Sequence, residues 1–273
     1  MRQGSIKKTD DLKISVLASG SSGNAIYVES AKTKLLVDCG LTGKKTTELL
    51  RQVDRDPADL DAILVSHEHT DHVHGVGVMS RKHNLDIYAN EKTWQAMNKK
   101  IGNIKTEHKY LFDVDELKTI GDIDILSFAV PHDAADPQFY TFQKNNKQFV
   151  ILTDTGYVSD RMRDALRNAD AYLMESNHDT SLLRMGGYPW PLKQRILSDK
   201  GHLSNEEGAL ALVDMIGDDT KRIYLGHLSK ENNMKEIARD TVEEILYRKD
   251  MGVNEQFYLY DTDPDEAQGL FTL

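Results

Sequence analysis

The chain is poor in cysteine, since its 273 residues include only Cys39. One thiol cannot form an internal disulfide or supply several ligands to a metal. A disulfide-stapled fold and a cysteine-rich metal site are therefore excluded. The chain also has no apolar run as long as a membrane span, and its first residues lack the apolar stretch of a signal peptide. We expect a soluble cytoplasmic protein with no membrane partner.

Positive charge is scarce as well, with 34 basic residues against 44 acidic ones and a net charge of −10. Long-range attraction to nucleic acid is therefore not a property of the whole molecule, and a polyanion would need a local basic surface. The length allows one large domain or two modest ones. Because the sequence shows no linker, repeat or low-complexity tract, we expect a flexible arm at residues 1–11 and a single domain over residues 12–273.

Strand-like and helix-like segments alternate along the chain. Residues 12–39 predict three strands in an antiparallel meander. Further strands are expected at residues 62–65, 86–89, 123–130, 138–143, 148–153, 171–174, 222–225 and 257–260. Helices are expected at residues 46–53, 73–81, 91–100, 161–168, 209–216 and 234–245. This order predicts two sheets flanked by helices.

Residues 67–72, with the sequence HEHTDH, place three imidazoles and two carboxylates next to one another. The segment begins where a short buried strand ends, which is the usual place for a ligand site in an α/β sheet. In an extended turn His67 and His69 point the same way while Glu68 points away. Such crowding is typical of a metal site, and the two adjacent ligand sets indicate two ions. Histidines on a solvated loop are the alternative for any one of these residues.

Three more candidate ligands each follow the end of an apolar strand: His132, Asp154 and His227. Side chains from different strands converge at such ends. Each residue alone has another explanation, as a turn residue, a cap or a polar residue near a helix. Their recurrence in the same structural position favours a shared site.

The pattern HxHxDH followed by a lone His, a lone Asp and a lone His resembles the metallo-β-lactamase superfamily. The resemblance implies an α/β fold, an αββα sandwich of two mixed sheets flanked by helices, with the site along one edge of the sheets. The metal ligands that it implies are His67, His69 and His132 for one ion, Asp71, His72 and His227 for the other, and Asp154 as a bridge. Asp38 matches an early Asp of the family that orients a ligand instead of binding metal.

Two divalent ions predict a hydrolase. A histidine and aspartate ligand set without cysteine suits Zn²⁺, and carboxylate-rich dinuclear sites also take Mn²⁺ or Fe²⁺. Such a pair lowers the pKa of a bridging water and holds a phosphoryl or carbonyl oxygen. We therefore expect a metal-bridging hydroxide as nucleophile, with Asp71 as a catalytic residue that accepts a hydrogen bond from it. No organic cofactor is indicated.

Further stretches narrow the resemblance to the YycJ/WalJ-like exonuclease subgroup: ASGSSGNA at 18–25, ESNHD at 175–179, GGYPWPLKQRILSDKGHLSN at 186–205 and LGHLSKENN at 225–233. The subgroup implies a bacterial cytoplasmic phosphodiesterase that degrades DNA from the five-prime end. Two alternatives remain open. One is a hydrolase of a small phosphodiester or lactone, and the other is a non-catalytic metal-binding regulatory module. The oligomeric state is not indicated.

Residues 181–200 carry four basic residues against one acidic residue, with two aromatic residues among them. Basic groups can hold phosphates while aromatic rings stack on bases. The substrate-binding candidates are Arg184, Tyr188, Trp190, Lys193 and Arg195. An ordinary loop that covers the core is the alternative.

Two histidines are candidate catalytic residues, namely His178 and His202, because each could protonate a leaving alkoxide or hold a phosphate oxygen. A histidine that is only hydrogen-bonded to nearby backbone is the alternative for both.

Overall fold

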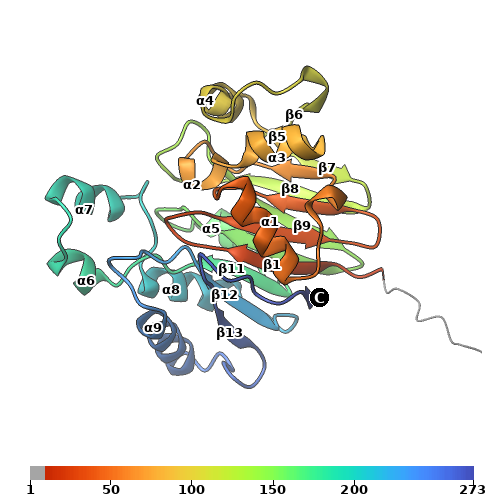
Figure 1. Ribbon diagram of the computed structural model, residues 1–273. Coiled ribbons are helices and arrows are strands. Elements are labelled where there is room, and N and C mark those ends of the chain that lie inside the picture. The colour runs from red at the N-terminus through yellow and green to blue at the C-terminus, as the bar shows by residue number, and fades with distance from the viewer. Residues whose placement is uncertain (1–9) are drawn as a thin grey trace, which may run out of the picture.

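Two seven-stranded sheets form the centre of the molecule, and helices cover their outer faces (Figure 1). The computed structural model describes residues 10–273. Of the arm expected at residues 1–11, all but Asp10 and Asp11 lies outside the described residues. Both sheets contain parallel and antiparallel pairs. The predicted α/β class, with two mixed sheets flanked by helices, is therefore confirmed.

The first sheet has its strands in the order β14-β1-β2-β3-β4-β5-β6. These strands are β1 (Lys13–Ala18), β2 (Ala25–Glu29), β3 (Lys34–Val37), β4 (Ala62–Leu64), β5 (Asp86–Ala89), β6 (Lys109–Leu111) and β14 (Phe271–Thr272). Strands β1 to β3 pair antiparallel, as the meander predicts, and β3 to β6 pair parallel.

The second sheet has the order β13-β12-β11-β10-β9-β8-β7. Its strands are β7 (Leu117–Ile120), β8 (Ile123–Ala129), β9 (Gln138–Lys144), β10 (Lys147–Leu152), β11 (Ala171–Glu175), β12 (Arg222–Gly226) and β13 (Tyr258–Asp261). Strands β10 to β13 run parallel, so their carboxyl ends meet at one edge of the sheet.

Nine α-helices occur in the part of the chain that the structure describes. They are α1 (Gly43–Gln52), α2 (Thr70–Val73), α3 (Val76–His83), α4 (Glu91–Ile101), α5 (Asp160–Ala165), α6 (Thr180–Met185), α7 (Trp190–Ile196), α8 (Asn205–Met215) and α9 (Lys235–Arg248). Short 3₁₀ turns lie at Pro57–Asp59 and Thr106–His108. The capping box expected at the start of α8 is present. Among the described residues, no helix has both the length and the apolar character needed to cross a bilayer.

The apolar strands are buried on both faces. In β2, Ile26 and Val28 belong to the core between the sheets, whereas Tyr27 packs in the core beneath the outer helices. In β3, Leu35 and Leu36 divide in the same way. Because successive side chains point to opposite faces, a strand between two apolar layers needs a continuous apolar run.

The helical pair α6 and α7 was not predicted, since no helix is expected from the sequence between residues 174 and 209. In Figure 1 these two helices project from the body of the fold, next to the strand ends. Few apolar residues of either helix are buried, with Leu183 fully covered. A helix with so little buried apolar surface shows almost no helical hydrophobic pattern in its sequence.

A half-buried carboxylate joins the two sheets at the turn between β2 and β3. Asp122, between β7 and β8, accepts hydrogen bonds from Thr33 Oγ1 at 2.8 Å and Lys144 Nζ at 2.9 Å, and another from the Ser30 hydroxyl. Burial raises the pKa of Asp122, but these hydrogen bonds outweigh it and lower the pKa to about 2.

We expect the substitution Asp122→Asn to lower the free energy of unfolding by about 1–3 kcal/mol at pH 7, because it weakens charge-assisted hydrogen bonds. A carboxyl group whose pKa is lower in the folded state stabilises that state above its unfolded pKa. This contribution fades as the pH falls from about 4 towards about 2. Urea unfolding of both metal-stripped proteins at decreasing pH measures the effect. A difference between wild type and variant that does not shrink with acid would contradict it.

Candidate functional site

The candidate residues sit just beyond the carboxyl ends of strands, and the backbone is strained there. Asp38 follows β3, Asp154 follows β10 by two residues and His227 follows β12, and their φ angles are 59°, 48° and 54°. A residue with a β-carbon rarely adopts this left-handed conformation, which costs on the order of 1 kcal/mol and clusters at functional sites. The packed sheets hold these residues in place against that cost.

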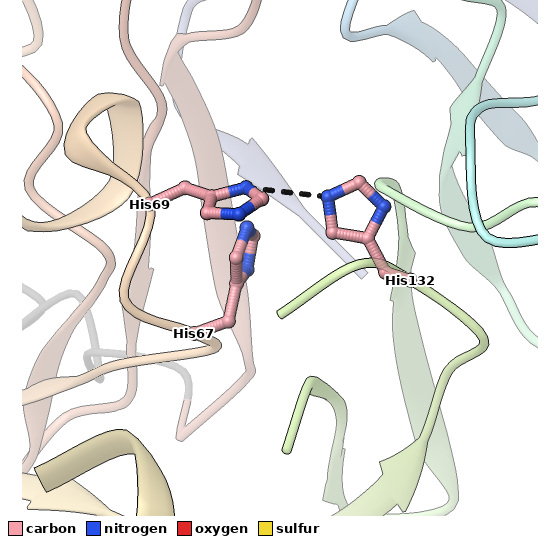
Figure 2. Close-up of side chains that lie close together, drawn as sticks. All are labelled: His67, His69 and His132. Carbon is pink, nitrogen blue, oxygen red and sulfur yellow. Dashed lines mark hydrogen bonds between the residues drawn. The ribbon is translucent and has the colours of Figure 1, made fainter. Parts of the chain in front are cut away.

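His67, His69 and His132 form the first ligand group, and Figure 2 shows their rings pointing toward one another. One ring nitrogen of each lies within 4.8 Å of the other two, and His69 Nδ1 is 3.3 Å from His132 Nε2. His67 is fully buried, and its Nε2 has no hydrogen-bond partner among residues 10–273. Burial lowers the pKa of His67 well below its ordinary value. This ring is therefore neutral, and its free lone pair fits a divalent cation.

The second ligand group joins the other expected residues. His72 Nε2 lies 3.4 Å from Asp71 Oδ2 and 3.3 Å from Asp154 Oδ2. His227 Nδ1 is 2.8 Å from the same oxygen of Asp154. Burial lowers the pKa of His72, but Asp154, Asp71 and Asp38 raise it well above its ordinary value. These three carboxylates carry negative charge that a proton on His72 offsets. A metal cation bound beside His72 would offset it in the same way.

Asp154 occupies the centre of the cluster. It belongs to three of the four potential ligand groups in the described chain. Its Oδ2 faces His72 and His227, while its Oδ1 lies 3.9 Å from His132 Nε2. Burial raises the pKa of Asp154, but the neighbouring His227 and His72 lower it well below its ordinary value. The structure thus brings together all seven residues expected as ligands, with one carboxylate oxygen directed at each group.

Asp38 holds a ligand in position, as the resemblance implies. Its Oδ2 is 2.8 Å from His72 Nδ1, and it also accepts a hydrogen bond from Ser66 Oγ at 2.7 Å. The backbone N–H of Ser66 donates to Asp38 Oδ1 at 2.8 Å. With Nδ1 engaged by Asp38, Nε2 is the atom of His72 that would bind a metal; it faces Asp71 and Asp154, and Asn24 Nδ2 lies 3.1 Å from it.

The loop before β2 supports the cluster from the other side. Asn24 N donates to the Asp71 carbonyl at 2.8 Å, and Ser19 Oγ accepts from His227 N, also at 2.8 Å. A β-carbon on Gly40 would lie 1.6 Å from Asp71 O, so only glycine allows this close approach. In the sequence, Ser19 and Asn24 stand out only as part of the stretch 18–25, and their side-chain types alone do not predict these contacts.

Glu175 is a functional candidate that the sequence analysis did not assign. It is fully buried at the end of β11, and its Oε1 lies 2.7 Å from His202 Nδ1. Its Oε2 accepts a hydrogen bond from Thr155 N at 2.9 Å. Burial lowers the pKa of His202, but Glu175 and Asp154 raise it to about 9. A buried acid at a strand's carboxyl end is the signal that could have identified Glu175.

His202 and His178 lie in different surroundings. His202 belongs to a potential ligand group with His132 and Asp154, which places it at the cluster. His178 is 1% exposed, and neither of its ring nitrogens has a hydrogen-bond partner among the described residues. Burial lowers the pKa of His178. Of the two predicted catalytic histidines, the geometry therefore favours His202.

The expected substrate-binding residues divide between exposed and buried positions. Trp190 is 60% exposed, Arg184 is exposed and Tyr188 is half-buried. Lys193 differs from expectation, because it is buried and its Nζ donates to the carbonyls of Arg184 and Gly186 at 2.7 Å each. Lys193 therefore joins the end of α6 to α7 and is no free cation.

Arg195 connects α7 to the cluster. Its guanidinium group pairs with Asp133, whose other oxygen lies 3.4 Å from His132 Nε2. A pocket of about 160 Å³ opens between these elements. Its lining includes Ser21, Asp133, Asn177, Tyr188, Leu192, Arg195, Ile196, Gly201, His202 and Ser229. The pocket thus joins part of the basic and aromatic surface to His202.

Known proteins resemble this chain over most of its length. The model of the "Beta-lactamase superfamily domain" family matches residues 33–228. "Exodeoxyribonuclease WalJ" of Streptococcus pneumoniae strain D39 is 60% identical over 260 residues, which cover 94% of this chain and 97% of that protein. "Exodeoxyribonuclease YycJ" of Bacillus anthracis is 55% identical over 253 residues, covering 93% and 96%.

Solved structures agree on the fold. The metallo-β-lactamase fold protein YhfI of Bacillus subtilis superposes with a TM-score of 0.72 at 20% identity, over 95% of this chain and 99% of YhfI. The match of the family model, the identity to WalJ and YycJ and the two-sheet architecture all lead to one conclusion. The chain belongs to the metallo-β-lactamase superfamily and is a WalJ/YycJ-like member of it.

Proposed function

We propose that this hydrolase is a metal-dependent exodeoxyribonuclease that binds two divalent ions and removes nucleotides from the five-prime end of DNA. The observation that carries the proposal is the convergence of six His and Asp side chains around Asp154, in a chain 60% identical to a protein named exodeoxyribonuclease. The five-prime polarity depends on the subgroup resemblance alone. The ligand set suits Zn²⁺ or Mn²⁺, with Fe²⁺ as a further choice.

The residues present fit such ions. His67 Nε2 is a buried nitrogen with no hydrogen-bond partner in the described chain, so its lone pair can bind a metal. Asp154 presents one oxygen to each ligand group. Bound divalent ions would lower the pKa of a coordinated water and offset charge on the scissile phosphate. Asp71, 24% exposed at its side chain, would accept a hydrogen bond from the attacking water. Water would then displace the leaving oxygen from phosphorus.

The leaving oxygen needs a proton when the P–O bond breaks. Glu175 binds His202 Nδ1, which leaves Nε2 of that ring free to donate. Because His202 also lines the pocket beside Arg195, its ring is next to the space that a strand end would occupy. We assign His202 as the general acid and Glu175 as the positioning residue that holds its ring.

End-labelled single-stranded and duplex DNA, incubated with Mn²⁺ or Zn²⁺, tests the proposed activity. We expect release of labelled mononucleotides by wild type and none by Asp71→Ala. Labels at the five-prime and three-prime ends show the polarity. Cleavage that persists in Asp71→Ala would indicate a contaminating nuclease and remove the support for this activity.

Replacing Trp190, whose ring is exposed, tests whether the substrate is DNA or a small phosphodiester. We expect Trp190→Ala to raise the KM for DNA roughly ten-fold, because stacking on one base contributes about 1–3 kcal/mol. The reference is turnover of bis(p-nitrophenyl) phosphate, which carries no nucleobase to stack on Trp190. An equal KM for DNA in wild type and variant would favour the small-diester alternative. Metal binding with no turnover of either substrate would favour the regulatory module.

A further inference from the structure

Helix α4 and strand β6 carry a basic surface on a chain that is acidic overall. Residues 81–111 contain seven Lys and Arg residues and three Asp and Glu residues, although the whole chain has a net charge of −10. No step of the proposed hydrolysis uses this segment. A local excess of positive charge on an acidic protein indicates a site for a polyanion.

Aromatic rings lie among these cations. A shallow pocket of about 320 Å³ is lined by Trp94, Gln95, Asn98, Lys109, Tyr110 and Leu111. The ammonium group of Lys109 lies 5.5 Å from the centre of the Trp94 ring. Tyr110 is 40% exposed and stacks on Tyr88 with a centroid distance of 4.9 Å. We call the surface made by Trp94, Lys99, Lys109 and Tyr110 the α4–β6 face.

Two lysines of this face are free to bind an external anion. Lys99 follows Gln95 by four residues, so it lies on the same side of α4 as the pocket. Lys99 and Lys109 are exposed, and within residues 10–273 neither has an acidic partner within 4.0 Å. Lys92, by contrast, pairs with Asp136 at 3.3 Å. Binding a phosphate group through Lys99 or Lys109 would therefore break no existing ion pair.

The α4–β6 face is continuous with the ligand cluster. Lys100 Nζ, near the end of α4, donates to the Glu68 carbonyl at 2.8 Å, within the ligand segment 67–72. At the start of α4, Asn90 Nδ2 donates to the Asp136 carbonyl at 2.7 Å, in the loop that carries His132. In Figure 1, α4 lies above α2, while α6 and α7 lie to its left. The cluster thus has a surface with basic and aromatic side chains on each of two sides.

We infer that the α4–β6 face binds single-stranded DNA, and that it holds the part of the strand that extends away from the cleaved end. This inference rests on the proposed function, since it assigns the site a substrate longer than the pocket beside His202. Lys99 and Lys109 bind phosphates, and Trp94 and Tyr110 offer ring surfaces to unpaired bases. An acidic protein segment would use the cations but would gain nothing from aromatic ring faces, on which unpaired bases stack.

Binding is measured by fluorescence anisotropy with metal-loaded protein and a labelled 30-nucleotide phosphorothioate strand, which resists cleavage. We expect the double variant Lys99→Ala, Lys109→Ala to bind on the order of ten-fold more weakly. We also expect the slope of log Kd against log salt to fall by about 1.4, from about 0.7 per lost phosphate contact. Lys99→Arg with Lys109→Arg keeps both charges and should restore the slope.

A charge-matched control is Lys32→Ala with Lys249→Ala. Lys32 lies in the β2–β3 turn, at the far end of β2 from the ligand-supporting Asn24, and Lys249 ends α9. We expect this variant to keep the wild-type affinity and slope. If the Lys99, Lys109 variant binds like wild type, or if the control loses as much affinity, the inference is overturned. Tight binding by wild type without cleavage of an unmodified strand would instead refute the proposed nuclease and leave the α4–β6 face standing.

Discussion

Replacing Asp154 by alanine is expected to reduce DNA degradation on the order of a thousand-fold and to leave the protein with fewer than two bound metal ions. Asp154 faces both ligand groups, with Oδ2 at 2.8 Å from His227 Nδ1 and Oδ1 at 3.9 Å from His132 Nε2. Its loss removes the proposed bridge, and it leaves buried histidines without their counter-charge. Metal analysis of protein purified without added ions, together with kcat, measures both effects.

Glu68→Gln is the matched control for this prediction. Glu68 lies within the same six-residue segment, but its Oε1 accepts a hydrogen bond from Ala135 N at 2.9 Å and belongs to no ligand group in the described chain. Glutamine keeps that acceptor. We expect the metal content of Glu68→Gln to equal that of wild type. A full complement of two ions in Asp154→Ala would refute the bridging role.

Replacing His202 by alanine is expected to lower kcat for DNA by a factor of about 10² to 10⁴, the range for loss of a general acid. Comparing two substrates with different leaving groups tests whether His202 donates the proton. Hydrolysis of bis(p-nitrophenyl) phosphate releases a phenolate that needs no proton, so its kcat should fall far less. If both substrates lose activity equally, His202 acts as a ligand or a phosphate contact and not as the proton donor.

Glu175→Gln tests the positioning role in the same experiment. The amide keeps the size of the side chain but loses the charge that holds His202 Nδ1 at 2.7 Å. We expect kcat for DNA to fall about 10- to 100-fold, as for other residues that orient a functional histidine. The loss should again be small for the p-nitrophenyl diester, and the metal content should stay at the wild-type value. Equal loss on both substrates would show that Glu175 supports only the fold.

Much of the cluster could be predicted from short-range features. Residues 67–72 combine three histidines and an aspartate within six positions, and this local pattern can be recognised without knowing the order of the strands. His132, Asp154 and His227 were found because each follows an apolar strand, and parallel strands bring their carboxyl ends to one edge. The structure places all of them together.

Other assignments depended on contacts that no local pattern carries. The sequence places Lys193 among the cations of a surface loop, yet α6 and α7 fold back so that its ammonium group satisfies two carbonyls. In the sequence, Glu175 stands out only as part of the stretch ESNHD at 175–179, although it binds His202, 27 positions away. The short strands β6 and β7 were not predicted, because three or four partly exposed residues show no clear alternation.

The superfamily, the candidate ligand residues and the class of chemistry follow from the sequence alone, because residue type and strand-end position are local properties. The folded structure adds which carboxylate faces both ligand groups, which histidine has a buried acid behind it and which lysines are free. Burial and partner choice depend on side chains distant in sequence. The pairing of Glu175 with His202 and the separation of the α4–β6 face from α7 therefore emerge only when the two sheets pack together.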